Sequence, residues 1–139
     1  MYCACSFPGR RDQVSRVREL VGRQLADSPA ADDAVLLASE LAANACAHSA
    51  SGRPGGQFVV RLRGSGSSRG QVYVEVEDQG SSWDGFLHQT ESPHGLYLLR
   101  SLAADYGTRP GASGWITWFV VGVGMRDAGP GPVPARESR

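Results

Sequence analysis

The sequence predicts an α+β fold, a two-layer sandwich in which helices cover one face of a mixed, mostly antiparallel β-sheet. Its 139 residues are enough for one two-layer core but too few for two independent cores. Helical periodicity fills residues 10–49, and two segments with alternating apolar residues follow directly. Because strands joined by a short polar turn run antiparallel, we expect the helices to share one face of a single sheet.

An edge strand over residues 1–9 and two helices are expected at the start of the chain. In residues 10–26, apolar side chains recur every three or four positions, which is typical of an amphipathic helix. Ser28 then suits an N-cap and Pro29 the first helical position, because a helix start does not need the N–H that proline lacks. The second helix is expected to continue to about residue 49.

Alternating apolar residues predict an antiparallel hairpin after the helices. Residues 79–93 show no period and predict a long loop, which in a compact domain is typically functional or disordered. A helix is expected over residues 95–104 and a strongly apolar strand over residues 115–123. The hairpin side chains expected to face the core are Phe58, Val60 and Leu62 in its first strand and Val72, Val74 and Val76 in its second.

One domain over residues 1–123 is predicted, with its core over about 10–123 and a disordered Gly/Pro-rich tail over 124–139. The 14 basic and 14 acidic residues balance, so the chain lacks the basic excess of a general nucleic-acid binder. All basic residues are arginine, which excludes a lysine-dependent phosphate loop. No apolar run approaches the ~18 residues of a membrane span, and no secretory leader is expected. The three cysteines favour the reducing cytoplasm.

The second helix carries polar residues on a face that is otherwise rich in small apolar residues. Glu40, Asn44 and His48 follow one another at intervals of four, so they project from one side of the helix. A carboxylate and an amide one turn apart can share a hydrated Mg²⁺ ion bound with phosphate. The alternative is an ordinary solvated polar face.

A second polar residue interrupts the buried face of the predicted hairpin. Asp78 has the same parity as Val76, so its carboxylate is directed toward the core at the end of the strand. A buried carboxylate needs a hydrogen-bond donor, which a ligand amino group could supply, and Gly80 would let a planar ring approach the backbone. Alternatively, Asp78 caps its own turn as an Asx residue.

Two further features lie toward the end of the chain. His94, Gly95 and Leu96 open the helix after the long loop, where free N–H groups favour phosphate. A loop histidine is nevertheless more often simply solvated. Thr117 places a hydroxyl on a strand face of large apolar residues, where it is expected to need a hydrogen-bond partner. Alternatively, threonine occurs here only because β-branched residues favour strands.

In order and spacing, these features resemble the GHKL ATP-binding superfamily, which has the Bergerat fold and includes histidine kinases, gyrase B and MutL. The similarity covers about residues 10–123 and is carried by E-x-x-x-N at 40–44, D-x-G at 78–80, H-G-L at 94–96 and G-x-x-T-W-F at 114–119. Residues 29–45 are similar to the bacterial anti-sigma factor serine/threonine kinases of the RsbW/SpoIIAB type.

This resemblance implies a role for each candidate residue. Glu40 would be the general base, Asn44 the Mg²⁺ ligand, and His48 a further residue that binds the nucleotide. Asp78 would accept a hydrogen bond from the adenine amino group of ATP, and residues 81–94 would form the ATP lid. The other implied contacts with the nucleotide are Gly80 and Thr117 beside adenine, and His94, Gly95 and Leu96 on the phosphate side.

The implied function is phosphorylation of a serine on a STAS anti-anti-sigma protein, sequestration of a sigma factor, or both, in a chain that can form a homodimer. Ser82 and Pro93 depart from glycines that are common in the family, so the alternative is a nucleotide-binding regulatory module with little or no kinase activity. A third possibility is a small interaction protein without nucleotide. Trp83 and Phe86 are candidates for contact with a partner or with the nucleotide.

Overall fold

The computed structural model describes residues 2–64, 70–80 and 93–122. These residues form an open five-stranded sheet in the order β1-β2-β3-β5-β4, and each neighbouring pair is antiparallel. The α+β class is confirmed, but the expected parallel component of a mixed sheet does not occur among the described strands. The strands are β1 (Tyr2–Pro8), β2 (Gln57–Gly64), β3 (Gln71–Glu77), β4 (Asp105–Pro110) and β5 (Trp115–Gly122).

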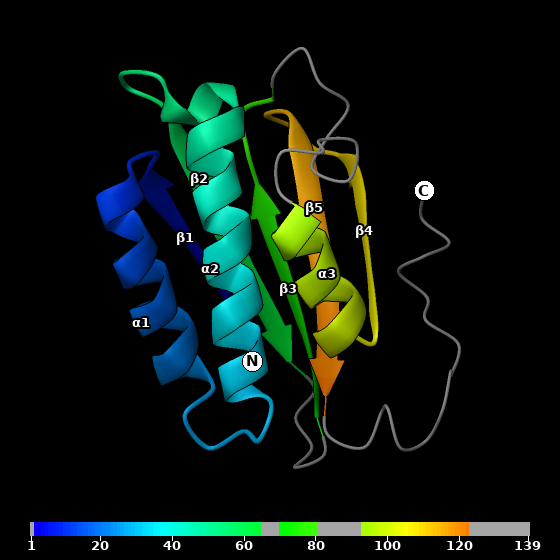
Figure 1. Cartoon of the computed structure of the whole chain (residues 1–139). Helices are drawn as coiled ribbons and strands as arrows, with labels where there is room; N and C mark the ends of the chain where they lie inside the picture. The colour runs from blue at the N-terminus through cyan, green and yellow to red at the C-terminus, as the bar shows by residue number, and fades with distance from the viewer. Residues whose placement is uncertain (1, 65–69, 81–92, 123–139) are drawn as a thin grey trace.

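Three α-helices pack side by side on one face of the sheet, as Figure 1 shows. They are α1 (Val14–Gln24), α2 (Ala31–His48) and α3 (Pro93–Leu102), and the short 3₁₀ turns η1 (Arg11–Gln13) and η2 (Ala50–Gly52) precede α1 and follow α2. The core lies between the two layers, where the predicted inward residues of the hairpin are at most 4% exposed. None of the described helices is both long enough and apolar enough to cross a membrane.

The second helix begins later than its sequence suggests. Ser28 was expected to cap it and Pro29 to open it, but α2 begins at Ala31, and the Ala30 N-cap has no side-chain hydrogen bond. Ser28 instead closes a local turn, in which its Oγ accepts a hydrogen bond from the Ala30 N–H at 3.1 Å. Its carbonyl oxygen also accepts from the Ala31 N–H at 3.1 Å, so this turn uses the groups that an N-cap would need.

Strand β4 was not predicted from the sequence. It contains Gly107 and Pro110, which are depleted in strands, and it lies at the edge of the sheet, where proline is tolerated because one side of the strand needs no ladder bonds. The predicted edge strand at the start of the chain is confirmed as β1, which pairs with β2. The lid over residues 81–92, including Trp83 and Phe86, and the tail over 124–139 lie outside the described residues.

Gly107 is required by the packing of Trp118, its partner on β5. A Cβ atom at Gly107 would lie 2.8 Å from Cζ2 of Trp118, a side chain that is fully buried. We therefore expect Gly107→Ala to lower the free energy of unfolding by about 1–3 kcal/mol, the usual cost of overpacking.

Urea denaturation followed by circular dichroism measures this effect, and Gly22→Ala is the matched control. A Cβ at Gly22, inside α1, would meet only Val35 Cγ2 at 3.8 Å, an ordinary contact. The control should be neutral or stabilising by about 0.5–1 kcal/mol, because alanine favours helix. Equal effects of the two substitutions would show that the contact with Trp118 does not limit the size of residue 107.

Candidate functional site

A cleft lies between the C-terminal half of α2 and the ends of β3 and β5. Its enclosed space is about 10 Å³, roughly the room that one water molecule needs. Four of the residues predicted from the sequence line it together, which brings three separate elements to one place. The lining residues are Leu41, Asn44, Ala45, His48 and Ser49 from α2 and its end, Val76 and Asp78 from β3 and the residue after it, and Thr117 from β5.

Asn44 contributes a side chain whose orientation is fixed by its own helix. It is only 8% exposed, and its Nδ2 donates to the main-chain carbonyl of Glu40 at 2.9 Å. The donor end of the amide is therefore engaged, and the Oδ1 atom is left as an acceptor at the cleft. A neutral amide oxygen held in this way suits a hard cation such as Mg²⁺.

Asp78 contributes a carboxylate that is partly buried beside the core. Burial raises the pKa of Asp78 above its ordinary value, and the nearby Glu77 charge raises it further. Hydrogen bonds to Oδ1 act in the opposite direction, from the backbone N–H of Gly80 at 2.7 Å and that of Trp115 at 3.4 Å. Among the described residues no group donates to Oδ2, so Asp78 caps its turn with one oxygen and keeps the other available.

The turn that follows Asp78 is held in place by η2, the 3₁₀ turn that follows α2. The backbone N–H of Gln79 donates to Ser51 Oγ at 3.0 Å, and the backbone N–H of Ala50 donates to the Gly80 carbonyl at 2.7 Å. Gly80 has φ +79°, which is in the left-handed region that favours glycine. Sequence reasoning missed Ser51, which is fully buried, because nothing in its local sequence indicates its contact with residue 79.

Thr117 and His48 complete the polar lining of the cleft. Thr117 is 3% exposed and lies opposite Val76 in the β3–β5 ladder, on the same sheet face as Asp78. Thr117 thus lines the same cleft as Asp78, although it comes from a strand that lies far away in the sequence. His48 lies one turn beyond Asn44 and lines the same cleft.

Other predicted site residues do not line this cleft. Glu40 is half-buried one turn before Asn44, and its main-chain carbonyl accepts the hydrogen bond from the Asn44 side chain. Gly80 acts through its N–H bond to Asp78. Gly95 and Leu96 lie in the first turn of α3 and do not line the cleft, and His94 lies in the same turn, with its side chain outside the described part of the structure.

The donor set in the cleft fits an adenine nucleotide with Mg²⁺. The Asp78 Oδ2 atom, to which none of the described residues donates, could accept from an exocyclic amino group, and Gly80 itself carries no side chain. Asn44 supplies one oxygen for a cation, and Mg²⁺ characteristically takes its remaining ligands from water and phosphate oxygens. The described residues include no cluster of three or more His, Cys, Asp or Glu side chains that could hold a metal ion.

Comparison with known proteins gives an independent assignment. The model of the histidine kinase-like ATPase domain matches residues 7–121, which include every element from the end of β1 to β5. No curated protein matches the chain significantly. The match spans more than half of the sequence and covers all the residues that line the cleft. The chain therefore belongs to the histidine kinase-like ATPase domain family, of the GHKL type, and this membership indicates that it binds ATP.

Proposed function

We propose that this chain is a cytoplasmic serine/threonine protein kinase of the anti-sigma factor type, which transfers phosphate from MgATP to a serine of a STAS anti-anti-sigma protein. The observation that carries the proposal is the convergence of Asn44, Asp78 and Thr117 on one cleft from three different elements. Sequestration of a sigma factor, by a monomer or a homodimer, is the second activity that we propose for the same chain. The similarity of residues 29–45 to the anti-sigma factor kinases supports this assignment.

Different residues of the chain would have separate roles in phosphoryl transfer. Asp78 and Thr117 would hold adenine, and Asn44 would hold Mg²⁺ through its Oδ1 atom. Glu40 lies one turn away on the same helix, half-buried, and would accept the proton of the incoming serine hydroxyl. The nucleotide supplies the phosphoryl group, and transfer of this kind depends mainly on positioning and on neutralisation of charge.

A nucleotide-binding regulatory module without kinase activity is the second candidate. The position of Glu40 favours it, because the proposed base does not line the cleft that Asn44 and Asp78 share. By contrast, Pro93 does not disturb its helix, since it occupies the first position of α3, where proline is well tolerated. In this case the chain would bind ATP and act by capture of a partner alone.

Transfer of label from [γ-³²P]ATP to a cognate STAS-domain protein, with Mg²⁺ present, tests the proposal. We expect one phosphoserine on the STAS protein, none on a variant in which the acceptor serine is alanine, and none when Mg²⁺ is removed with EDTA. Nucleotide affinity is measured on the same preparation by calorimetry. Binding without transfer would select the regulatory module, and absence of binding would reject both candidates.

A further inference from the structure

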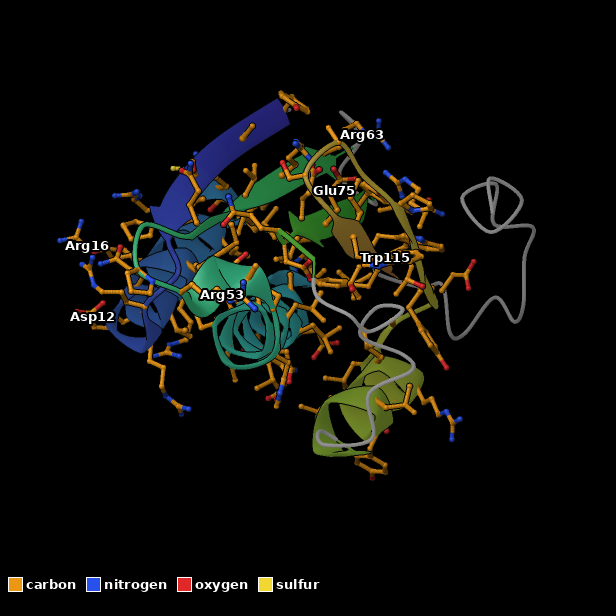
Figure 2. The ribbon with its side chains drawn as sticks, turned by 90° about the horizontal axis from the view of Figure 1, so that it is seen from above. Asp12, Arg16, Arg53, Arg63, Glu75 and Trp115 are labelled. Carbon is orange, nitrogen blue, oxygen red and sulfur yellow. The ribbon has the colours of Figure 1, made fainter. Side chains whose placement is uncertain are left out.

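The face of the sheet that no described helix covers carries a network of charged side chains behind the cleft. Figure 2 shows Glu75 of β3 and Arg63 of β2 on the side of the sheet opposite the helices. Although this face is open, Glu75 and Glu77 are only 6% and 3% exposed. Arg61 bridges them, with Nη1 2.5 Å from Glu75 Oε2 and Nη2 2.7 Å from Glu77 Oε1.

The two glutamates differ in what their remaining oxygens contact. Glu75 Oε1 accepts from Tyr73 at 2.6 Å and from Arg109 at 2.7 Å, so Glu75 stays within the network. Glu77 Oε2 instead accepts from the backbone N–H of Ser113 at 2.8 Å, in the turn that joins β4 to β5. Glu77 is thus an anchor for residues 111–114, a turn that is closed by a bond from the Gly111 N–H to the Gly114 carbonyl at 2.8 Å.

This anchored turn lies directly on the backbone that shapes the nucleotide site. A Cβ atom at Gly114 would be 2.4 Å from the Gly80 nitrogen and 2.6 Å from the Asp78 carbonyl oxygen, so only glycine allows the two turns to pack this closely. The next residue, Trp115, exchanges bonds with Asp78: its carbonyl accepts from the Asp78 N–H at 2.9 Å, and its N–H donates to Oδ1 at 3.4 Å.

We propose that Glu77 is a positioning residue for Asp78, which acts from the opposite face of the sheet by holding the turn 111–114 against residues 78–80. Glu77 has no place in the cleft, so it contributes to purine selectivity without touching the nucleotide. This inference rests on the proposed role of Asp78 in the recognition of adenine. When the anchor is removed, the 111–114 turn can move away, and the Asp78 carboxylate loses the support that fixes its direction.

The test compares Glu77→Ala with the matched control Glu75→Ala. Both substitutions remove a buried carboxylate that pairs with Arg61, but only the first releases the 111–114 turn. Affinities for ADP and for inosine diphosphate, which has an oxygen in place of the amino group, are measured by calorimetry, with folding verified by circular dichroism. We expect the preference for ADP to fall about 2- to 12-fold in Glu77→Ala, the effect of one lost hydrogen bond, and to stay unchanged in Glu75→Ala.

Glu77→Gln serves as the milder variant if Glu77→Ala does not fold. It keeps the shape and one acceptor oxygen, so a smaller loss of the same preference is expected. A wild-type protein that binds ADP no better than inosine diphosphate would refute the role of Asp78, and with it this inference. If the wild-type protein prefers ADP but the Glu77 and Glu75 variants behave alike, the inference alone is overturned.

Discussion

Glu40→Gln is expected to reduce phosphoryl transfer about 10²- to 10⁴-fold, the usual contribution of a general base, while ADP affinity stays unchanged. The structure gives a reason for this separation. Asn44 is oriented by the main-chain carbonyl of Glu40, so replacement of the carboxylate leaves the Mg²⁺ ligand where it is. Glutamine also preserves length and shape at this half-buried position.

The experiment measures single-turnover transfer to the STAS protein and, separately, ADP affinity. Glu19→Gln is the matched control, because Glu19 is an exposed carboxylate on α1 outside the cleft, and this variant should keep full activity. Transfer at the wild-type rate in Glu40→Gln would contradict the proposed base. A loss of ADP affinity equal to the loss of transfer would mean that Glu40 helps to bind the nucleotide with Mg²⁺ and does not act as the base for the serine proton.

Asp78→Asn is expected to weaken ADP binding about 10- to 150-fold, the range for a hydrogen bond to a charged group. The Gly80 N–H bonds to Oδ1 at 2.7 Å, so the single oxygen of asparagine is needed there. Its NH₂ group then faces the cleft and meets the amino group of adenine, which is also a donor. Calorimetry measures the change, and Asp27→Asn, an exposed site in the α1–α2 connection, is the control that should bind normally.

The same substitution should leave the fold intact or make it more stable at neutral pH. Burial raises the pKa of Asp78, so the folded state holds this proton more tightly than the unfolded chain does. The stabilising effect of the protonated form is therefore lost as the pH rises from the ordinary pKa of 3.8 through the raised pKa of the folded state. Asparagine carries no charge, so its burial has no such cost. Urea unfolding at pH 7 should therefore show Asp78→Asn to be at least as stable as the wild type, and this difference should vanish at acid pH.

A marked loss of stability in Asp78→Asn at pH 7 would contradict this account of the buried carboxylate. It would show that the hydrogen bonds of the ionised Asp78 carboxylate stabilise the fold by more than the burial of its charge destabilises it. The affinity measurement would then have to be repeated at a temperature where the variant is fully folded. The two readouts thus separate a ligand-binding aspartate from one that serves only its own turn.

Much of the site could be predicted from periodicity. Alternation in β3 places Asp78 on the face of Val76, and the structure confirms that both line the cleft. Helical spacing also placed Asn44 and His48 together, and both line the cleft. Glu40, one turn before Asn44, is not among the lining residues, and its role as the base stays a prediction. The residues of α2 that line the cleft are Leu41, Asn44, Ala45 and His48.

The features that sequence could not supply depend on contacts between distant segments. β4 is a strand despite its composition, because it pairs with β5 over Asp105–Pro110. Ser51 contacts Gln79, and Glu77 contacts Ser113, across separations that no local pattern records. The start of α2 was missed for a different reason. The Ser28 hydroxyl, which could cap a helix, instead accepts a hydrogen bond within a local turn, and the sequence does not distinguish the two.

Calorimetric titration of the wild-type chain and of Asp78→Asn with ADP, in the presence of Mg²⁺, tests the central claim most directly. We predict one bound nucleotide per wild-type chain, loss of most of that affinity in Asp78→Asn, and weaker binding when Mg²⁺ is removed. Wild-type protein that is folded but releases no heat with ADP, or an Asp78→Asn variant that binds as tightly as the wild type, would contradict the assignment of this cleft to the nucleotide.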